Sequence, residues 1–160
     1  MDHHKLLQQF AAYNLWANTR FIDRLGGLSD GLLDRAVPSS FPSLRSTVLH
    51  IRDAEHVWWC RLTEARPSWP AEGSKEIGTL LPYSARLRDL VDGMSARSLT
   101  EERVYSDLKG NQHRQAAWQM LLHCFNHGTQ HRGQLITMMR TLELGDIPAN
   151  DLVVHQRSLT

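Results

Sequence analysis

The stretch from Ala116 to Leu142 carries the strongest helical pattern in the chain, because apolar side chains recur in it at three- and four-residue spacing. It is apolar on much of its circumference, which predicts a central helix with neighbours on several sides. His127 and His131 lie four residues apart on its apolar side. Residues at that spacing lie one above the other on a helix, so two imidazoles there can bind one metal ion. The stretch therefore predicts a helical protein with metal ligands on its last long helix.

Two glycines, Gly128 and Gly133, interrupt the same stretch. Each costs about 1 kcal/mol relative to alanine in the interior of a helix. We therefore expect another backbone to approach this helix closely at the two positions.

Three further segments show helical periodicity, with glycine or proline near their ends. We expect helices over about residues 2–25, 43–64, 82–98 and 113–143. Four amphipathic helices indicate an all-α protein, a four-helix bundle formed by a single domain over residues 1–160. The connection between the second and third helices is long, which predicts a crossover there.

Two weaker patterns complete the chain. The turn signal Lys109-Gly110-Asn111 predicts a short irregular ribbon over residues 104–111, before the last helix. The tail, residues 151–160, is expected to add one short turn packed on the bundle.

Composition narrows the class of function. Of the 160 residues 41% are hydrophobic, which is enough for one sizeable core, and the formal net charge is +1. This charge gives no electrostatic footprint for nucleic acid or membrane, and the scattered basic residues are interpreted as solvated surface. No segment has the length of a membrane span. The two cysteines, Cys60 and Cys124, share no CxxC spacing, so we expect no disulfide and a cytoplasmic protein.

Three histidines, His123, His127 and His131, share one face of the predicted last helix. His123 and His131 are about 12 Å apart along the axis, too far to bind one ion. The pair is therefore either His123 with His127 or His127 with His131, and another ligand must come from elsewhere. In the second helix, His50 lies at the edge of the apolar face, whereas His56 points to the opposite side. Helical geometry alone favours His50 with one of the two pairs.

The last helix contains the run Asn126-His127-Gly128-Thr129-Gln130-His131-Arg132-Gly133-Gln134-Leu135. This run closely resembles the N-H-x-x-x-H-R-G-Q-L signature of the DinB-like (damage-inducible) family. Further segments resemble that family in the same order along the chain, within residues 14–18, 47–58 and 105–118. The resemblance covers about residues 5–142, nearly the whole chain.

The resemblance implies a four-helix bundle, often dimeric, that binds one divalent metal through His50, His127 and His131. Zinc and nickel are the first candidates for the metal, and iron and manganese are the alternatives. We expect the pocket to be lined by three neighbours of these ligands, His123, Met120 and Gln134. Relatives in the wider superfamily are thiol-dependent transferases and isomerases that use low-molecular-weight thiols.

Three neutral imidazoles leave a divalent ion with an open coordination position, as in catalytic zinc sites. Water or a small thiol bound there loses its proton near neutral pH. Glu55, Asn14 and Gln130 are the candidate catalytic residues. Glu55 is either a base near the metal or the ion-pair partner of a core arginine, and Asn14 is either a pocket residue or a hydrogen-bonded core amide. Asp53, one turn from His50, is either an orienting carboxylate or a surface one.

Three functions fit this pattern. The first is a metal-dependent enzyme that activates a small thiol or water, an S-transferase or a hydrolase. The second is a non-catalytic metal-binding bundle with a sensor or stress-response role. The third is a metal-free structural bundle. For the predicted homodimer, Trp16 and Trp118 place the interface on the first and last helices.

Overall fold

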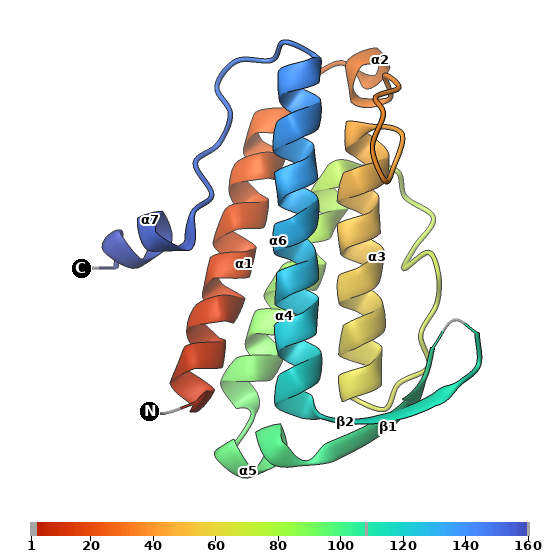
Figure 1. Cartoon of the computed structure of the whole chain (residues 1–160), viewed down its shortest axis with the longest axis vertical. Coiled ribbons are helices and arrows are strands. Elements are labelled where there is room, and N and C mark those ends of the chain that lie inside the picture. Colours follow the sequence, from red (N-terminus) through yellow and green to blue (C-terminus); the bar gives the residue numbers. More distant parts are fainter. Residues whose placement is uncertain (1–2, 108, 160) are drawn as a thin grey trace.

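The computed structural model describes residues 3–107 and 109–159, and four long helices lie side by side in it (Figure 1). They are α1 (His3–Leu25), α3 (Leu44–Leu62), α4 (Leu80–Gly93) and α6 (Ala117–Thr141). Helix α1 contacts α4 and α6, and α3 contacts the same two helices. The predicted all-α class is confirmed, with a two-stranded sheet as a minor addition.

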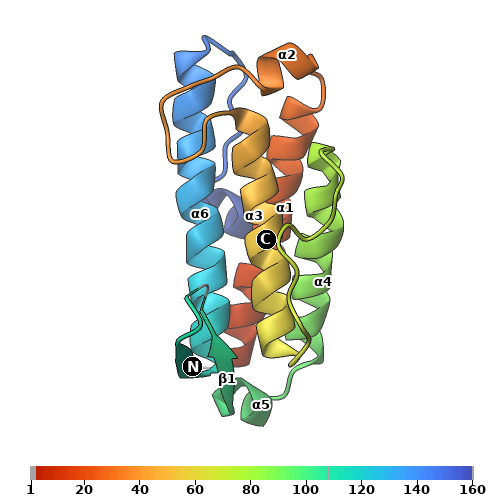
Figure 2. The same ribbon diagram turned by 90° about the vertical axis from the view of Figure 1, so that its right-hand side faces the viewer.

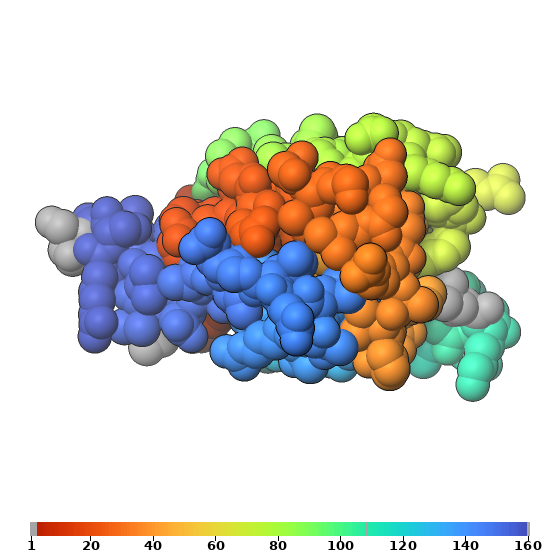
Figure 3. All heavy atoms as spheres, turned by 90° about the horizontal axis from the view of Figure 1, so that it is seen from above, coloured from red at the N-terminus to blue at the C-terminus, as the bar shows by residue number. Residues whose placement is uncertain are grey.

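Short elements connect the long helices. They are α2 (Asp30–Leu33), the 3-10 turn η1 (Ile77–Thr79), α5 (Ala96–Thr100), β1 (Glu102–Ser106) and β2 (Gln112–Ala116). A further short helix, α7 (Leu152–Arg157), follows α6. The connection between α3 and η1 runs beside α3 and α4 (Figure 2), whereas the loop between α2 and α3 reaches toward the end of α6. Seen from that end, residues of this loop lie beside those at the C-terminal end of α6 (Figure 3).

Two helix boundaries differ from the prediction. The last helix was expected from His113, but residues 112–116 form β2, which pairs with β1 in antiparallel register. The turn between the strands is held by Asp107, whose Oδ1 accepts the backbone N–H of Asn111 at 2.9 Å. The third helix was expected to reach Ser98, yet it ends at Gly93, because Ser95 caps a separate short helix by accepting the Ser98 N–H at 3.0 Å.

Other sequence expectations agree with the structure. A ribbon precedes α6, although it is a regular hairpin, and the tail forms the single helix α7. Helix α3 begins where serine and proline signals placed it, since the Ser43 hydroxyl accepts the Ser46 N–H at 3.1 Å. The expected start of the first helix at Asp2 lies outside the described residues. Among the described residues, no helix combines the length and apolarity needed to cross a membrane.

The apolar core has two parts. One surrounds the C-terminal half of α1, with Phe21 and Leu25, and the other surrounds its N-terminal half, with Leu7 and Ala11. Between them along the helices lies a group of buried polar side chains that we call the core network. It consists of Asn14, Asn18, Glu55, Ser84 and Arg132, one or two from each long helix.

The C-terminal segment after α6 lies along α1. The Arg24 guanidinium donates to the carbonyl of Gly145 at 2.8 Å, and Arg20 donates to that of Ala149 at 2.9 Å. Helix α7 projects from one side of the long helices and the hairpin from the other (Figure 1). The hairpin contacts α3, where Tyr105 of β1 packs against Trp58 with the ring centroids 5.5 Å apart.

Candidate metal centre

Helices α3 and α6 lie side by side and run in opposite directions (Figure 1), which brings His50 opposite His127 and His131. The Nε2 atom of His127 lies 3.0 Å from Nε2 of His50 and 3.0 Å from Nε2 of His131. His131 is buried, and the other two rings are partly exposed. The three residues, which we call the histidine cluster, are the group of potential metal ligands found in the described part of the chain.

The spacing of these nitrogen atoms fits a metal. Two ligand atoms of a tetrahedral ion lie about 3.3 Å apart when each bond is near 2.0 Å. The two separations of 3.0 Å are close to that value, and all three ligand atoms lie within 4.8 Å of one another, so side-chain adjustments can bring them around one ion. His127 Nε2 carries at most one proton and can donate it to only one neighbour. A cation therefore satisfies the three nitrogen atoms better than any arrangement of protons among them.

The lowered pKa values of two histidines in the cluster also favour the binding of a cation. Burial, followed by the proximity of His131, lowers the pKa of His50 from 6.5 to about 4, although Asp53 opposes the shift. Burial is again the largest cause at His127, where His131, His50 and His123 add to it and the pKa falls to about 3. Both rings are therefore neutral at pH 7, the form in which imidazole binds metals.

Gln134 orients the buried ligand. Its Oε1 lies 2.7 Å from Nδ1 of His131, and its Nε2 donates to the hydroxyl of Ser40 at 2.8 Å. An amide oxygen only accepts, so the proton of neutral His131 sits on Nδ1 and the lone pair of Nε2 faces the other histidines. Gln134 was expected to line the pocket; its contact with His131 is more specific than that.

Phe41 packs against the cluster and was not anticipated from the sequence. Its ring stacks on His50 with the centroids 4.0 Å apart and lies 5.6 Å from His131. Trp69 approaches His50 from another loop, with the centroids 5.7 Å apart. Phe41 and Trp69 belong to irregular segments, whose position no periodic pattern predicts.

Two of the candidate catalytic residues lie in the core network. The side-chain amides of Asn14 and Asn18 donate to Oε1 of Glu55 at 2.7 and 3.0 Å, and Ser84 donates to its Oε2 at 2.7 Å. Arg132 donates to Oδ1 of both asparagines, at 2.8 and 2.9 Å. Asn14 is thus a hydrogen-bonded core amide, and Glu55 is connected to Arg132 through Asn14 and Asn18 instead of by the direct ion pair that was one of its alternatives.

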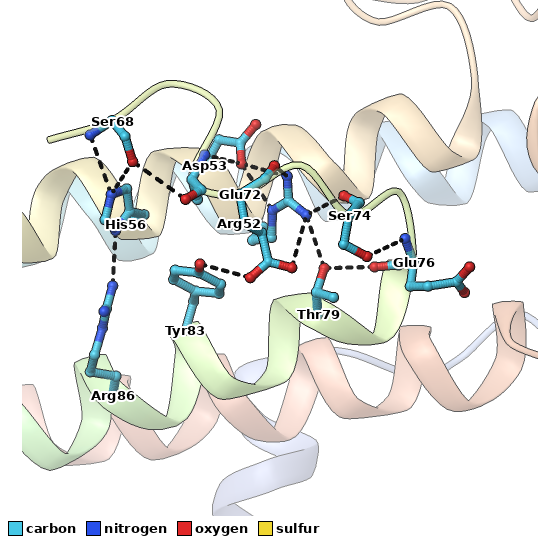
Figure 4. A network of polar contacts seen from close by, with 11 residues as sticks. Arg52, Asp53, His56, Ser68, Glu72, Ser74, Glu76, Thr79, Tyr83 and Arg86 are labelled. Carbon is cyan, nitrogen blue, oxygen red and sulfur yellow. Dashed lines mark hydrogen bonds and ion pairs between the residues drawn. The ribbon is translucent and has the colours of Figure 1, made fainter.

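Arginine was interpreted as surface from the composition, and this is wrong for Arg52 and Arg132. Arg132 is fully buried in the core network. Arg52 is buried between α3 and the following linker, where its Nη1 donates to the carbonyl of Ser74 at 2.8 Å (Figure 4). It also forms an ion pair with Asp53 at 2.9 Å. Asp53 is therefore buried and engaged by arginine, neither a surface carboxylate nor a hydrogen-bond partner of His50.

The remaining predicted residues are separated from the cluster in different ways. Met120 is fully buried in the apolar core, so it does not line an open pocket. His123 is exposed, and its ring is tilted against that of Trp58 with the centroids 4.7 Å apart. Its ring centroid lies 6.2 Å from that of His127. Gln130 is exposed.

A model of the DinB family matches residues 1–157. The chain belongs to the DinB family. The resemblance seen in the signature run is thereby confirmed, and no curated protein matches the chain. In this DinB-family protein the run from Asn126 to Leu135 has three structural roles: His127 and His131 join the cluster, Arg132 joins the core network, and Gln134 contacts Nδ1 of His131.

Proposed function

We propose that this DinB-family protein is a metal-dependent enzyme in which His50, His127 and His131 bind one divalent ion. The convergence of three Nε2 atoms, with 3.0 Å contacts from His127 to the other two, carries the proposal. Zinc and nickel suit three imidazoles, and iron or manganese are alternatives. Because the ligands are neutral, the ion keeps its full charge and an open position.

A bound divalent ion supplies a thiolate or hydroxide at neutral pH by lowering the pKa of a thiol or water. The chain's own thiols are poorly placed to act as nucleophiles. Cys60 and Cys124 are both buried, and burial raises the pKa of each thiol. The nucleophile of the reaction therefore comes from a small molecule that reaches the histidine cluster.

The position of Glu55 supports a thiol over water. A hydrolase that uses metal hydroxide benefits from a carboxylate that accepts protons near the reacting water. Glu55, the candidate for that role, is directed into the core, where Asn14, Asn18 and Ser84 donate to it. A thiol bound to a metal gives up its proton without such a base. We therefore propose transfer of a low-molecular-weight thiol to an electrophile, an S-transferase reaction.

We also propose the finer features of architecture expected from the resemblance. The four long helices constitute a four-helix bundle in one domain, with the connection between α3 and α4 as the crossover. A second copy packs on the face of α1 and α6, where Leu6 and Leu122 line a groove of about 770 Å³. Trp16 is less available for that interface, because the ring of His155 in α7 lies against it, with the ring centroids 5.2 Å apart. Two free cysteines suit a cytoplasmic protein.

Elemental analysis of protein purified without nickel resin tests the metal site. We expect about one divalent ion per chain in the wild type and in His123→Ala, and loss of the ion in His50→Ala and His127→Ala. His123 is the matched control, because it lies one turn from His127 but outside the cluster. Equal metal content in all four proteins would overturn the site.

Thiol binding tests the reaction. Cobalt-loaded protein should develop a sulfur-to-metal charge-transfer band when ethanethiol is added. Protein that binds cobalt but shows no such band would contradict the S-transferase reaction and leave a hydrolase or a non-catalytic metal-binding bundle.

A further inference from the structure

Trp69 is an exposed aromatic side chain beside the histidine cluster. It lies in the linker between α3 and η1, and 51% of its surface is exposed. Its ring meets that of His50 edge to face, with the centroids 5.7 Å apart and the planes at 64°. A large apolar ring that stays half in water gives up much of the stabilisation that burial would provide. Its position beside a potential metal ligand therefore calls for an explanation in function.

Residues on both sides of Trp69 are hydrogen-bonded to side chains of α3. The hydroxyl of Ser68 lies 3.0 Å from Nε2 of His56, whose Nδ1 lies 3.0 Å from the Arg86 guanidinium (Figure 4). On the other side, the N–H of Ala71 donates to Oδ1 of Asp53 at 3.0 Å. The two anchors are three residues apart, so the segment between them has little freedom to carry the indole away from His50.

Asp53 is itself held in place. Nε of Arg52 donates to its Oδ1 at 2.9 Å, and Arg52 also donates to the carbonyl of Ser74 at 2.8 Å (Figure 4). Arg52 is buried, so these bonds are protected from water. The result is a rigid linker that displays Trp69 at the edge of the cluster.

The opposite neighbour of His50 is also aromatic. Phe41, from the loop before α3, stacks on the His50 ring at 4.0 Å with the planes at 27°. Phe41 therefore uses its face to support His50 and His131, whereas the indole of Trp69 remains half accessible. Of these two rings, Trp69 is the one that leaves aromatic surface accessible to a ligand.

We infer that Trp69 forms one wall of the substrate site and selects small molecules that carry a metal-binding atom next to a flat, apolar group. The inference rests on the proposed metal site and specifies the substrate class for it. An indole offers a broad face for offset or edge-to-face contact with an aromatic ring. A ligand bound to the ion at the cluster places its substituent near Trp69, because the ring lies only 5.7 Å from His50.

Two alkyl thiols test the inference: ethanethiol and phenylmethanethiol, titrated into cobalt-loaded protein while the charge-transfer band is followed. We expect the wild type to bind phenylmethanethiol about three- to tenfold more tightly than ethanethiol, as a single aromatic contact allows. Trp69→Ala should bind both thiols with nearly equal dissociation constants, and Trp69→Phe should keep most of the preference. Val104→Ala is the control, because Val104 is equally exposed at 52% but lies on β1; it should behave as the wild type.

Cobalt content is measured separately for every variant, so that failure of the metal site and failure of the aromatic wall differ. No cobalt binding by the wild type would overturn both. Cobalt binding with equal affinity for the two thiols would overturn the inference about Trp69 alone. The same follows if Trp69→Ala weakens both thiols by the same factor, since Trp69 would then support the cluster and not the substituent.

Discussion

Helices α3 and α6 contribute residues to both the core network and the histidine cluster, yet the two regions treat polar atoms in opposite ways. Arg132 follows His131 directly, and Glu55 lies just over one turn from His50. In the core network the carboxylate accepts three hydrogen bonds, and the guanidinium reaches it through two asparagines. In the histidine cluster three similar nitrogen atoms lie close together, two of them on partly exposed rings and one on the buried His131.

This difference separates a structural polar site from a ligand site. In the core network most donors are paired with acceptors, as the cost of unpaired buried groups demands, although Nε of Arg132 has no hydrogen-bond partner. One residue earlier along α6 the chain places the ring nitrogen atoms of histidines against one another. Such an arrangement leaves the nitrogen atoms poorly satisfied in a metal-free protein, whereas a bound cation satisfies them. The core network then serves to hold the rotation of α6, so that His127 and His131 face His50.

Arg132→Met should have the largest effect. It leaves the Glu55 carboxylate in the core without the opposite charge and removes the donor from Asn14 and Asn18. Breaking a buried charge arrangement from one side costs about 3–5 kcal/mol. Urea unfolding in the presence of EDTA measures the loss. Arg97→Met is the control, because that side chain is 91% exposed; a similar loss in both variants would show that the core network is not structural.

Gln134→Ala should act on the histidine cluster alone. Without the acceptor at Nδ1, His131 is free to adopt the other tautomer or to rotate, and loss of such a partner weakens metal binding about ten- to a hundredfold. The affinity for zinc is measured by competition with a chromophoric chelator. Gln130→Ala provides a matched control, since Gln130 is exposed on the same helix. Unchanged affinity in Gln134→Ala would mean that packing alone orients the ring.

Gly128 and Gly133 allow a more detailed test of the core network, because only Gly128 lies against it. A Cβ at Gly128 would lie 3.0 Å from Oδ1 of Asn14 and 3.1 Å from Nη1 of Arg132, whereas a Cβ at Gly133 would meet nothing within 4 Å. Gly128→Ala should therefore destabilise the protein by about 1–2 kcal/mol, since overpacking exceeds the gain in helix propensity. Gly133→Ala should stabilise it by up to about 1 kcal/mol. Thermal unfolding of both variants measures this, and a gain at both positions would show that the core network tolerates extra volume.

The glycines also show what the sequence could predict and what it could not. A close approach was predicted at both positions, and it exists at Gly128 only. There it comes from side chains, not from another backbone. Helical periodicity reports which face of a helix is buried, but it does not reveal that a buried face carries an arginine balanced by residues on three other helices. Arg132 was for this reason interpreted as surface.

Helical periodicity predicted the positions of the three histidines better than those of the side chains around them. His50, His127 and His131 lie on regular helices, so their directions follow from their spacing, and the family resemblance selected among the pairs that geometry left open. Phe41 and Trp69 come from loops. The contact of Trp69 with His50 depends on tertiary hydrogen bonds such as the one between Ser68 and His56. The start of α6 was missed for a related reason, because strand pairing with β1 overrides the local helical pattern at residues 113–116.

The smallest expected effect is the dependence of stability on pH, which has opposite signs in the two regions. The pKa of His50 falls from 6.5 to about 4 on folding. Between these values the unfolded chain binds a proton that the folded, metal-free chain does not, so the free energy of unfolding decreases as the pH falls through this window. Burial instead raises the pKa of Glu55, and its contribution is present at low pH and lost as the pH rises.

Unfolding of metal-free protein at pH 5 and pH 7.5 separates the two contributions. The wild type should lose more stability at pH 5 than the double variant His50→Ala/His127→Ala, because the variant lacks both groups with lowered pKa values. Glu55→Gln should lose more than the wild type on the same change, because the opposing contribution is gone. Since the two rings are partly exposed, solvent screens their interactions and the differences should be small. A wild type and a double variant with the same pH dependence would show that the histidines are as easily protonated in the folded chain as in the unfolded one, and that the cluster is not prepared for a cation.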